Sequence, residues 1–138
     1  MKLKLYTDGG ARGNPGPAAY GFVVQDVTSG AVKLLEKCGN YLGEATNNQA
    51  EYAGLLAGLN WVVTHHPNSQ LSIFMDSLLI VNQVKGLFKI KNPALLPKYQ
   101  EVRGLLSQLP GYSISYLPRA QNALADALVN EALDSHLL

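Results

Sequence analysis

The feature that most constrains the fold is a change in hydrophobic pattern near Thr46. Before it, three segments have strand-like alternation or composition, at residues 2–8, 19–27 and 31–42. The second and third are separated by Thr28-Ser29-Gly30, which is typical of a hairpin turn. After it, helical and strand patterns alternate. This order predicts an antiparallel meander followed by parallel strands with crossover helices.

The second half starts with a helix whose first residue is marked by a capping box. Thr46 supplies a hydroxyl, and Gln49, three residues later, supplies an amide. The helix should stop before Pro67. The next elements are predicted as a strand at 71–76, a helix capped by Ser77 and ending near Gly86, a helix over 94–109, a strand at 112–117 and a helix from Asn122 into the 130s. We therefore expect an α/β fold with one mixed five-stranded sheet flanked by helices.

The length and composition indicate one domain over residues 1–138. The single cysteine, Cys38, excludes an internal disulfide and any cysteine-only metal site. No apolar run reaches the ~18 residues of a membrane span, and the first residues lack the apolar core of a signal peptide. We expect a cytoplasmic, monomeric protein that does not enter membranes.

The formal net charge is only +1, but the basic residues are unevenly distributed. The stretch from Lys85 to Arg103 carries five basic residues against Glu101 alone. Such a patch can contact phosphates even on a neutral protein, or it can simply be a solvated helix face. We assign Lys89 and Lys91 as candidate phosphate contacts.

Four carboxylates occupy positions that a functional site would use. Asp8 ends the first strand, just before residues 9–18, where four glycines and two prolines predict a loop. Asp76 ends the fourth strand, so the two lie side by side if those strands are parallel neighbours. Glu51 shares an apolar helix face, and Asp126 lies among apolar residues early in the last helix.

Each acidic residue also has a simpler interpretation. Asp8-Gly9 can be a turn, Asp76-Ser77 a helix cap, and Glu51 a partly exposed helix residue. Together, however, buried acids without a cationic partner would repel one another. A divalent cation resolves that repulsion, and oxygen-only ligands favour Mg²⁺ or Mn²⁺ over zinc.

Four ordered motifs resemble type 1 ribonuclease H over nearly the whole chain. They are Tyr6-Thr7-Asp8-Gly9-Gly10 with Gly13-Asn14-Pro15-Gly16, Thr46-Asn47-Asn48-Gln49-Ala50-Glu51, Asp76-Ser77, and Asn122-Ala123-Leu124-Ala125-Asp126. The resemblance implies a ribonuclease H-like fold and an endonuclease that cleaves the RNA strand of RNA/DNA hybrids with two Mg²⁺ ions, for which Mn²⁺ substitutes. It also implies 5′-phosphate and 3′-hydroxyl products.

The resemblance further implies a role for each matching position. The metal-binding and catalytic carboxylates would be Asp8, Glu51, Asp76 and Asp126. Hybrid contacts would come from Gly9, Gly10, Gly13, Asn14, Thr46, Asn47 and Asn48, with the glycines letting the backbone approach RNA 2′-hydroxyls.

The sequence departs from the family pattern in two ways. Many members have a histidine in the loop before the fourth carboxylate, where this chain has Arg119 and no histidine. We place Arg119 among the catalytic residues, as a phosphate ligand. We also expect a compact form of the family, without the basic protrusion and the separate hybrid-binding domain of other members.

Two other functions remain open at this point. One is a non-catalytic module that binds nucleic acid or protein on the same fold. The other is a different nuclease or strand-transfer enzyme on that fold. The presence of all four carboxylates argues against the first, and the Thr46–Glu51 motif and the type of glycine loop argue against the second.

Overall fold

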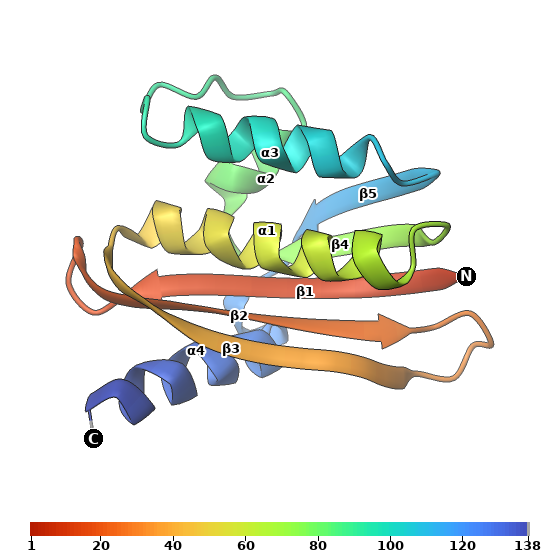
Figure 1. Ribbon diagram of the computed structural model, residues 1–138, viewed down its shortest axis with the longest axis horizontal. Coiled ribbons are helices and arrows are strands. Elements are labelled where there is room, and N and C mark those ends of the chain that lie inside the picture. Colours follow the sequence, from red (N-terminus) through yellow and green to blue (C-terminus); the bar gives the residue numbers. More distant parts are fainter. Residues whose placement is uncertain (138) are drawn as a thin grey trace.

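The computed structural model, which describes residues 1–137, is built around one five-stranded sheet (Figure 1). The strand order is β3-β2-β1-β4-β5. β1 pairs with β2 and β2 with β3 in antiparallel fashion, whereas β4 is parallel to both β1 and β5. The predicted meander and parallel half are confirmed. The strands are β1 (Lys2–Ala11), β2 (Gly16–Asp26), β3 (Lys33–Ala45), β4 (Gln70–Met75) and β5 (Gly111–Tyr116).

Helices cover both faces of the sheet, with α1 in front and α4 behind in the view of Figure 1. The helices are α1 (Asn47–His65), α2 (Leu78–Val84), α3 (Leu96–Leu106) and α4 (Ala123–Leu137), with a 3₁₀ turn, η1, at Arg119–Gln121. Within residues 1–137, none of these helices combines the length and the apolar character needed to traverse a bilayer.

The larger core lies between the sheet and the α1–α3 layer. Leu3 and Leu5 of β1 and Ile73 of β4 pack there against Leu55 and Leu59 of α1. Burying such side chains contributes roughly 1.5–3 kcal/mol each. The core therefore fixes α1 across the centre of the sheet, which determines where Glu51 lies.

A smaller cluster fixes α4 on the opposite face, where Ala19 of β2 meets Val129 and Leu133. Two strand glycines allow this close approach. A Cβ at Gly21 would lie 2.7 Å from the Ala125 carbonyl oxygen, and one at Gly39 would lie 2.7 Å from that of Leu128. The absence of side chains here brings the start of α4, and Asp126, close to the sheet.

The predicted loop over residues 9–18 is wrong in its extent. β1 continues to Ala11 and β2 begins at Gly16, so Gly9, Gly10 and Ala11 pair with Tyr20, Ala19 and Ala18. Glycine adopts extended backbone readily, and pairing with β2 overrides the local turn signal. The real loop is residues 12–15, with Gly13 at φ 92°. The third helix is also shorter than the predicted 94–109.

Candidate active site

Three carboxylates meet at the carboxyl end of the parallel strands. Asp8 lies near the end of β1, Asp76 follows β4 directly, and Glu51 projects from the first turns of α1. One oxygen from each lies within 4.8 Å of the other two. Asp8 and Asp76 are thus neighbours, as parallel pairing of their strands predicts.

Gly9 makes room for this cluster. Its amide donates to Asp8 Oδ1 at 2.9 Å and to Glu51 Oε1 at 3.3 Å. A Cβ at Gly9 would overlap the backbone of Ala50 in α1. Its lack of a side chain therefore serves helix packing, and the contact of its backbone with RNA stays a prediction.

Gly10 is different, because a Cβ there would meet nothing nearer than Asn47 Oδ1 at 4.0 Å. Gly13 sits in the exposed 12–15 loop, where its positive φ favours glycine. These two glycines, unlike Gly9, border open space.

The start of α1 is tied to the β1–β2 loop by asparagine side chains. Asn47 Oδ1 accepts from the Ala11 amide at 2.8 Å, and Asn14 Oδ1 accepts from the Asn47 amide at 3.0 Å. These bonds fix the orientation of both amides, and the side-chain NH₂ group of each is a donor for a ligand. The predicted capping box is confirmed, with Thr46 Oγ1 accepting from Gln49 N at 3.1 Å and Gln49 Oε1 accepting from Thr46 N at 2.9 Å.

Burial dominates the electrostatics of the three acids. Desolvation raises the pKa of Asp8 to about 7, although a hydrogen bond with Glu51 opposes it. Desolvation and repulsion by Asp8 raise the pKa of Glu51 well above its usual range, and desolvation also raises the pKa of Asp76. Among the described residues, Glu51 Oε2 is a buried oxygen without a hydrogen-bond partner. An oxygen-only, charge-repelling site of this kind fits a hard divalent cation such as Mg²⁺.

The fourth carboxylate, Asp126, is held by other partners. Arg119 Nη2 lies 3.2 Å from Asp126 Oδ1, and Asn130 Nδ2 lies 3.4 Å from Oδ2. Asp126 is not part of the three-acid cluster. Asp126 therefore has a cationic partner, because η1 presents Arg119 to the first turn of α4.

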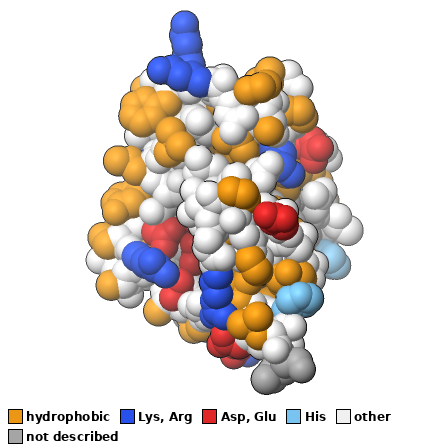
Figure 2. Space-filling view, turned by 90° about the vertical axis from the view of Figure 1, so that its left-hand side faces the viewer, with side chains coloured by type: hydrophobic (Ala, Val, Ile, Leu, Met, Phe, Trp, Pro, Cys, Tyr) orange, Lys and Arg blue, Asp and Glu red, His pale blue; other side chains and the backbone are white. Residues whose placement is uncertain are grey.

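All four acids line one cavity of about 420 Å³. Figure 2 faces this end of the molecule and shows acidic side chains gathered in a recess with basic side chains beside it. The cavity is bounded by β1, α1 and α4. Its walls are completed by Gly9, Gly10, Ala11, Arg12, Asn47, Arg119, Val129, Asn130 and Leu133.

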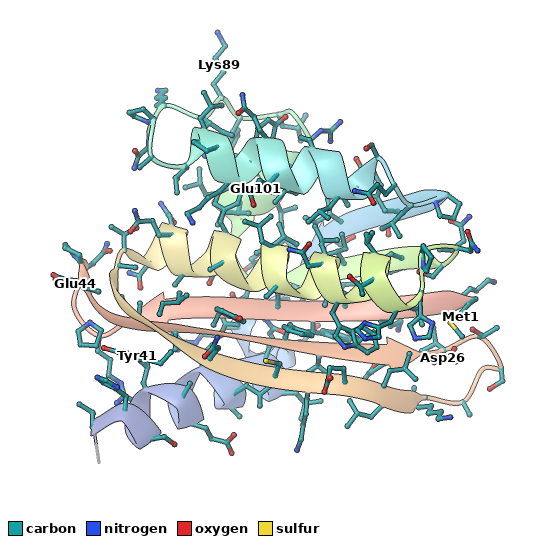
Figure 3. The ribbon with its side chains drawn as sticks, viewed as in Figure 1. Met1, Asp26, Tyr41, Glu44, Lys89 and Glu101 are labelled. Atoms are coloured by element: carbon teal, nitrogen blue, oxygen red, sulfur yellow. The ribbon has the colours of Figure 1, made fainter. Side chains whose placement is uncertain are left out.

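The two predicted lysines lie elsewhere. Lys89 and Lys91 line a second depression of about 520 Å³, next to Asn48 at the start of α1. Figure 3 shows Lys89 reaching outward beyond α3. Leu87 and Phe88, 69% and 48% exposed, lie in the same depression. We call this surface, from Asn48 to Lys91, the lysine groove.

Three residues at the site were not predicted as site residues from the sequence. Asn130 follows Asp126 by four positions, a spacing that places both on one helix face. Arg12 was visible as a cation within the glycine-rich segment. Asn122, 1% exposed, donates to the Thr7 carbonyl at 2.9 Å and so ties the start of α4 to β1; only its place in the fourth motif signalled it.

Comparisons with known proteins agree with this arrangement. A family model described as reverse transcriptase-like matches residues 6–132. The chain is similar to the bifunctional protein Rv2228c of Mycobacterium tuberculosis, with 43% identity over 135 residues, 98% of this chain and 36% of that protein. It is also 41% identical to ribonuclease HI of Halobacterium salinarum over 133 residues, 96% of this chain and 65% of that protein.

Solved structures show the same likeness. The crystal structure of the Halobacterium salinarum RNase H1 superposes with a TM-score of 0.90 at 40% identity, covering 98% of this chain and 99% of that one. LC11-RNase H1, from compost, crystallised in complex with an RNA/DNA hybrid, gives 0.91 at 38% identity, covering 99% of both chains. The chain spans about a third of the length of Rv2228c and 65% of the Halobacterium protein.

Proposed function

The chain belongs to the type 1 ribonuclease H family, and we propose that it hydrolyses the RNA strand of RNA/DNA hybrids in a metal-dependent endonucleolytic reaction. The observation that carries the proposal is the cluster of Asp8, Glu51 and Asp76, with oxygens within 4.8 Å of one another at the end of parallel strands. LC11-RNase H1, which has the same fold at 38% identity, was crystallised with such a hybrid.

The acids would hold two Mg²⁺ ions, or Mn²⁺ in their place. Bound metal supplies charge neutralisation, activation of water and stabilisation of a leaving oxygen. Asp8, Glu51 and Asp76 bind from the buried side, where the unpartnered Glu51 Oε2 is available as a ligand. Asp126 is the fourth ligand, and Asn130 orients its carboxylate.

The substrate would lie across the open side of the cavity. Asn47 lines that cavity and Asn14 lies in the adjoining 12–15 loop, and each would offer its side-chain amide nitrogen as a donor. Gly10 and Gly13 leave the neighbouring backbone accessible to the 2′-hydroxyls of an RNA strand, the groups that separate RNA from DNA. Recognition of the RNA strand is thus assigned to the β1–β2 loop and the start of α1.

The DNA strand would run along the other side of α1. Asn48 and Thr46 lie at the start of that helix, and the lysine groove continues from Asn48. Lys89 and Lys91 supply positive charge for phosphates. The exposed side chains of Leu87 and Phe88 give the groove an apolar surface on which the sugars of the DNA strand would pack.

Arg119 binds the scissile or product phosphate. Its guanidinium stays protonated and cannot act as a general base, and Asp126 raises its pKa further. In-line attack then leaves a 5′-phosphate and a 3′-hydroxyl. Every group in this scheme comes from one chain, so we propose that the monomer is active.

The test is hydrolysis of a hybrid with a labelled RNA strand in Mg²⁺, compared with the variant Glu51→Gln. The substitution keeps the side-chain shape but removes a buried metal ligand. We expect cleavage by the parent protein and a loss of at least a hundredfold in the variant. A parent that binds the hybrid without cutting it, at any Mg²⁺ concentration, would identify a non-catalytic module instead.

A further inference from the structure

Arg12 lies at the wall of the carboxylate cavity and has no role in the scheme above. It is the first residue after β1, and its guanidinium Nη2 is 2.7 Å from Asp134 Oδ1 on α4. Both side chains are exposed, at 40% and 66%. Among the described residues that line the cavity, the basic ones are Arg12 and Arg119, against four acids. Arg119 pairs with Asp126, one of these four acids, whereas Arg12 pairs with Asp134, which does not line the cavity.

The backbone holds Arg12 in a fixed place. Its amide donates to the Pro17 carbonyl at 2.8 Å and closes the 12–15 loop. Gly16 packs so closely on the Arg12 carbonyl that no Cβ could be accommodated there. The same loop is anchored to α1 through Asn14. The backbone from which the Arg12 side chain projects is therefore fixed in position.

The position of Arg12 relative to Asp8 is set by the strand between them. Four residues of extended chain at ~3.3 Å each place the two Cα atoms ~13 Å apart. Arg12 thus lies beyond the acids, just past the end of β1, next to Gly13 and Asn14. An RNA strand that places one phosphate at the acids and passes over this loop would bring a later phosphate to Arg12.

The ion pair with Asp134 suits a group that must be exchanged. An exposed pair contributes little to folding stability and is screened by salt. A phosphate offers the guanidinium two parallel, charge-assisted hydrogen bonds. In the free protein, the ion pair with Asp134 holds the Arg12 side chain at the wall of the cavity. When substrate binds, the phosphate displaces Asp134 because it is the stronger partner.

We propose that Arg12 binds a phosphate of the RNA strand beyond the scissile one and releases Asp134 when it does so. The proposal rests on the proposed function. In this proposal Arg12 is a substrate-binding residue, and Asp134 is its ion-pair partner in the free protein. Substitutions of Arg12 and of Asp134 should therefore change the affinity for the hybrid in opposite directions.

The experiment measures hybrid binding by fluorescence anisotropy in Mg²⁺, in the Asp8→Asn background that prevents cleavage. Adding Arg12→Ala should weaken binding about tenfold, the scale of one charge-assisted contact. It should also reduce the slope of log K against log salt by about 0.9. Arg12→Lys should restore part of the loss, because charge survives without the planar fork.

Asp134→Ala provides the deciding comparison, because it frees Arg12 from its competitor. We expect hybrid binding to tighten in this variant, and the double variant to bind like Arg12→Ala alone. Lys33→Ala is the matched control, since it removes an exposed cation at the opposite end of the sheet, where Lys33 lies opposite Asp26 in the β2–β3 register. It should leave binding unchanged.

Two results would overturn the assignment of Arg12. If Asp134→Ala weakens binding as much as Arg12→Ala, and both lower the melting temperature equally, the pair is only a structural clasp between the loop and α4. If Arg12→Ala binds like its Asp8→Asn background, Arg12 makes no phosphate contact. A background that does not bind hybrid at all contradicts the proposed function, and with it the role of Arg12.

Discussion

Replacing Asp8 by Asn should make the metal-free protein more stable while abolishing hydrolysis. Asp8 is 6% exposed and lies against Glu51 and Asp76. The substitution keeps the shape and an acceptor for the Gly9 amide, and it removes a charge that burial and neighbouring acids disfavour. Function and stability therefore oppose each other at this position.

The magnitude follows from the pKa of Asp8, which burial raises from 3.8 to about 7. A carboxyl whose pKa is raised on folding favours the folded state at low pH, and this contribution is lost as the pH rises through the folded pKa. The difference corresponds to about 4 kcal/mol once Asp8 is fully ionised. The Asn side chain is polar and also loses hydration at this buried position, which offsets part of the gain, so we expect about 2 kcal/mol.

The assay is thermal unfolding in chelator at pH 8 and at pH 5. A gain of about 2 kcal/mol raises the melting temperature by ~7 °C for a domain of this size. The gain should fall to less than half at pH 5, because folded Asp8 then carries its proton while the unfolded chain, with the ordinary pKa of 3.8, is still ionised, and it should approach zero only below pH 3.8. Saturating Mg²⁺ should stabilise the parent more than the variant, because the variant has lost a ligand.

Asp26→Asn is a control that should change the stability in the opposite direction from Asp8→Asn. Hydrogen bonds from the Thr28 hydroxyl and amide lower the pKa of Asp26, so its charge is favoured in the folded state. This carboxylate lies at the far end of the sheet from the site (Figure 3), and its substitution should lower stability at pH 8. An Asp8→Asn protein that melts below the parent at pH 8 in chelator would refute the account of a repulsive acid cluster.

Three further results are expected. Hydrolysis should require Mg²⁺ or Mn²⁺ and fail with Ca²⁺, whose coordination is longer and looser; robust cleavage in excess chelator would contradict a metal site. Replacing Lys89 and Lys91 together by Ala should raise KM with little change in kcat, and a collapse of kcat at constant KM would show that they are not phosphate contacts. Arg119→Ala should lower kcat by roughly ten- to a hundredfold, about 1.4–2.7 kcal/mol, with partial recovery in Arg119→Lys; unchanged turnover in Arg119→Ala would leave Arg119 as a surface residue.

Much of this architecture could be predicted because its signals are local. The capping box at Thr46 and Gln49 is a pattern of two residues three positions apart, and the structure confirms it. The order of strands and helices implies which strands are parallel, and parallel pairing of β1 with β4 brings Asp8 beside Asp76. These inferences need periodicity and topology, not side-chain detail.

The remaining features depend on contacts between distant segments. The sequence around Gly9 and Gly10 predicts a loop, and only their pairing with β2 makes them part of a strand. That Gly9 accommodates α1 depends on the position of Ala50, more than forty residues away in sequence. The pairing of Asp126 with Arg119 depends on the turn η1, and the ion pair between Arg12 and Asp134 joins segments near the two ends of the chain.

The most direct test of the central claim is strand-specific cleavage of matched duplexes. RNA/DNA, DNA/DNA and RNA/RNA duplexes of one sequence, labelled on both strands, are incubated with the protein in Mg²⁺, and product ends are identified. We expect cuts in the RNA strand of the hybrid alone, with 5′-phosphate and 3′-hydroxyl ends, and none with Asp8→Asn. Cleavage of the DNA strand, or hybrid cleavage that persists in Asp8→Asn, would contradict the assignment of the carboxylate cluster as a ribonuclease H active site.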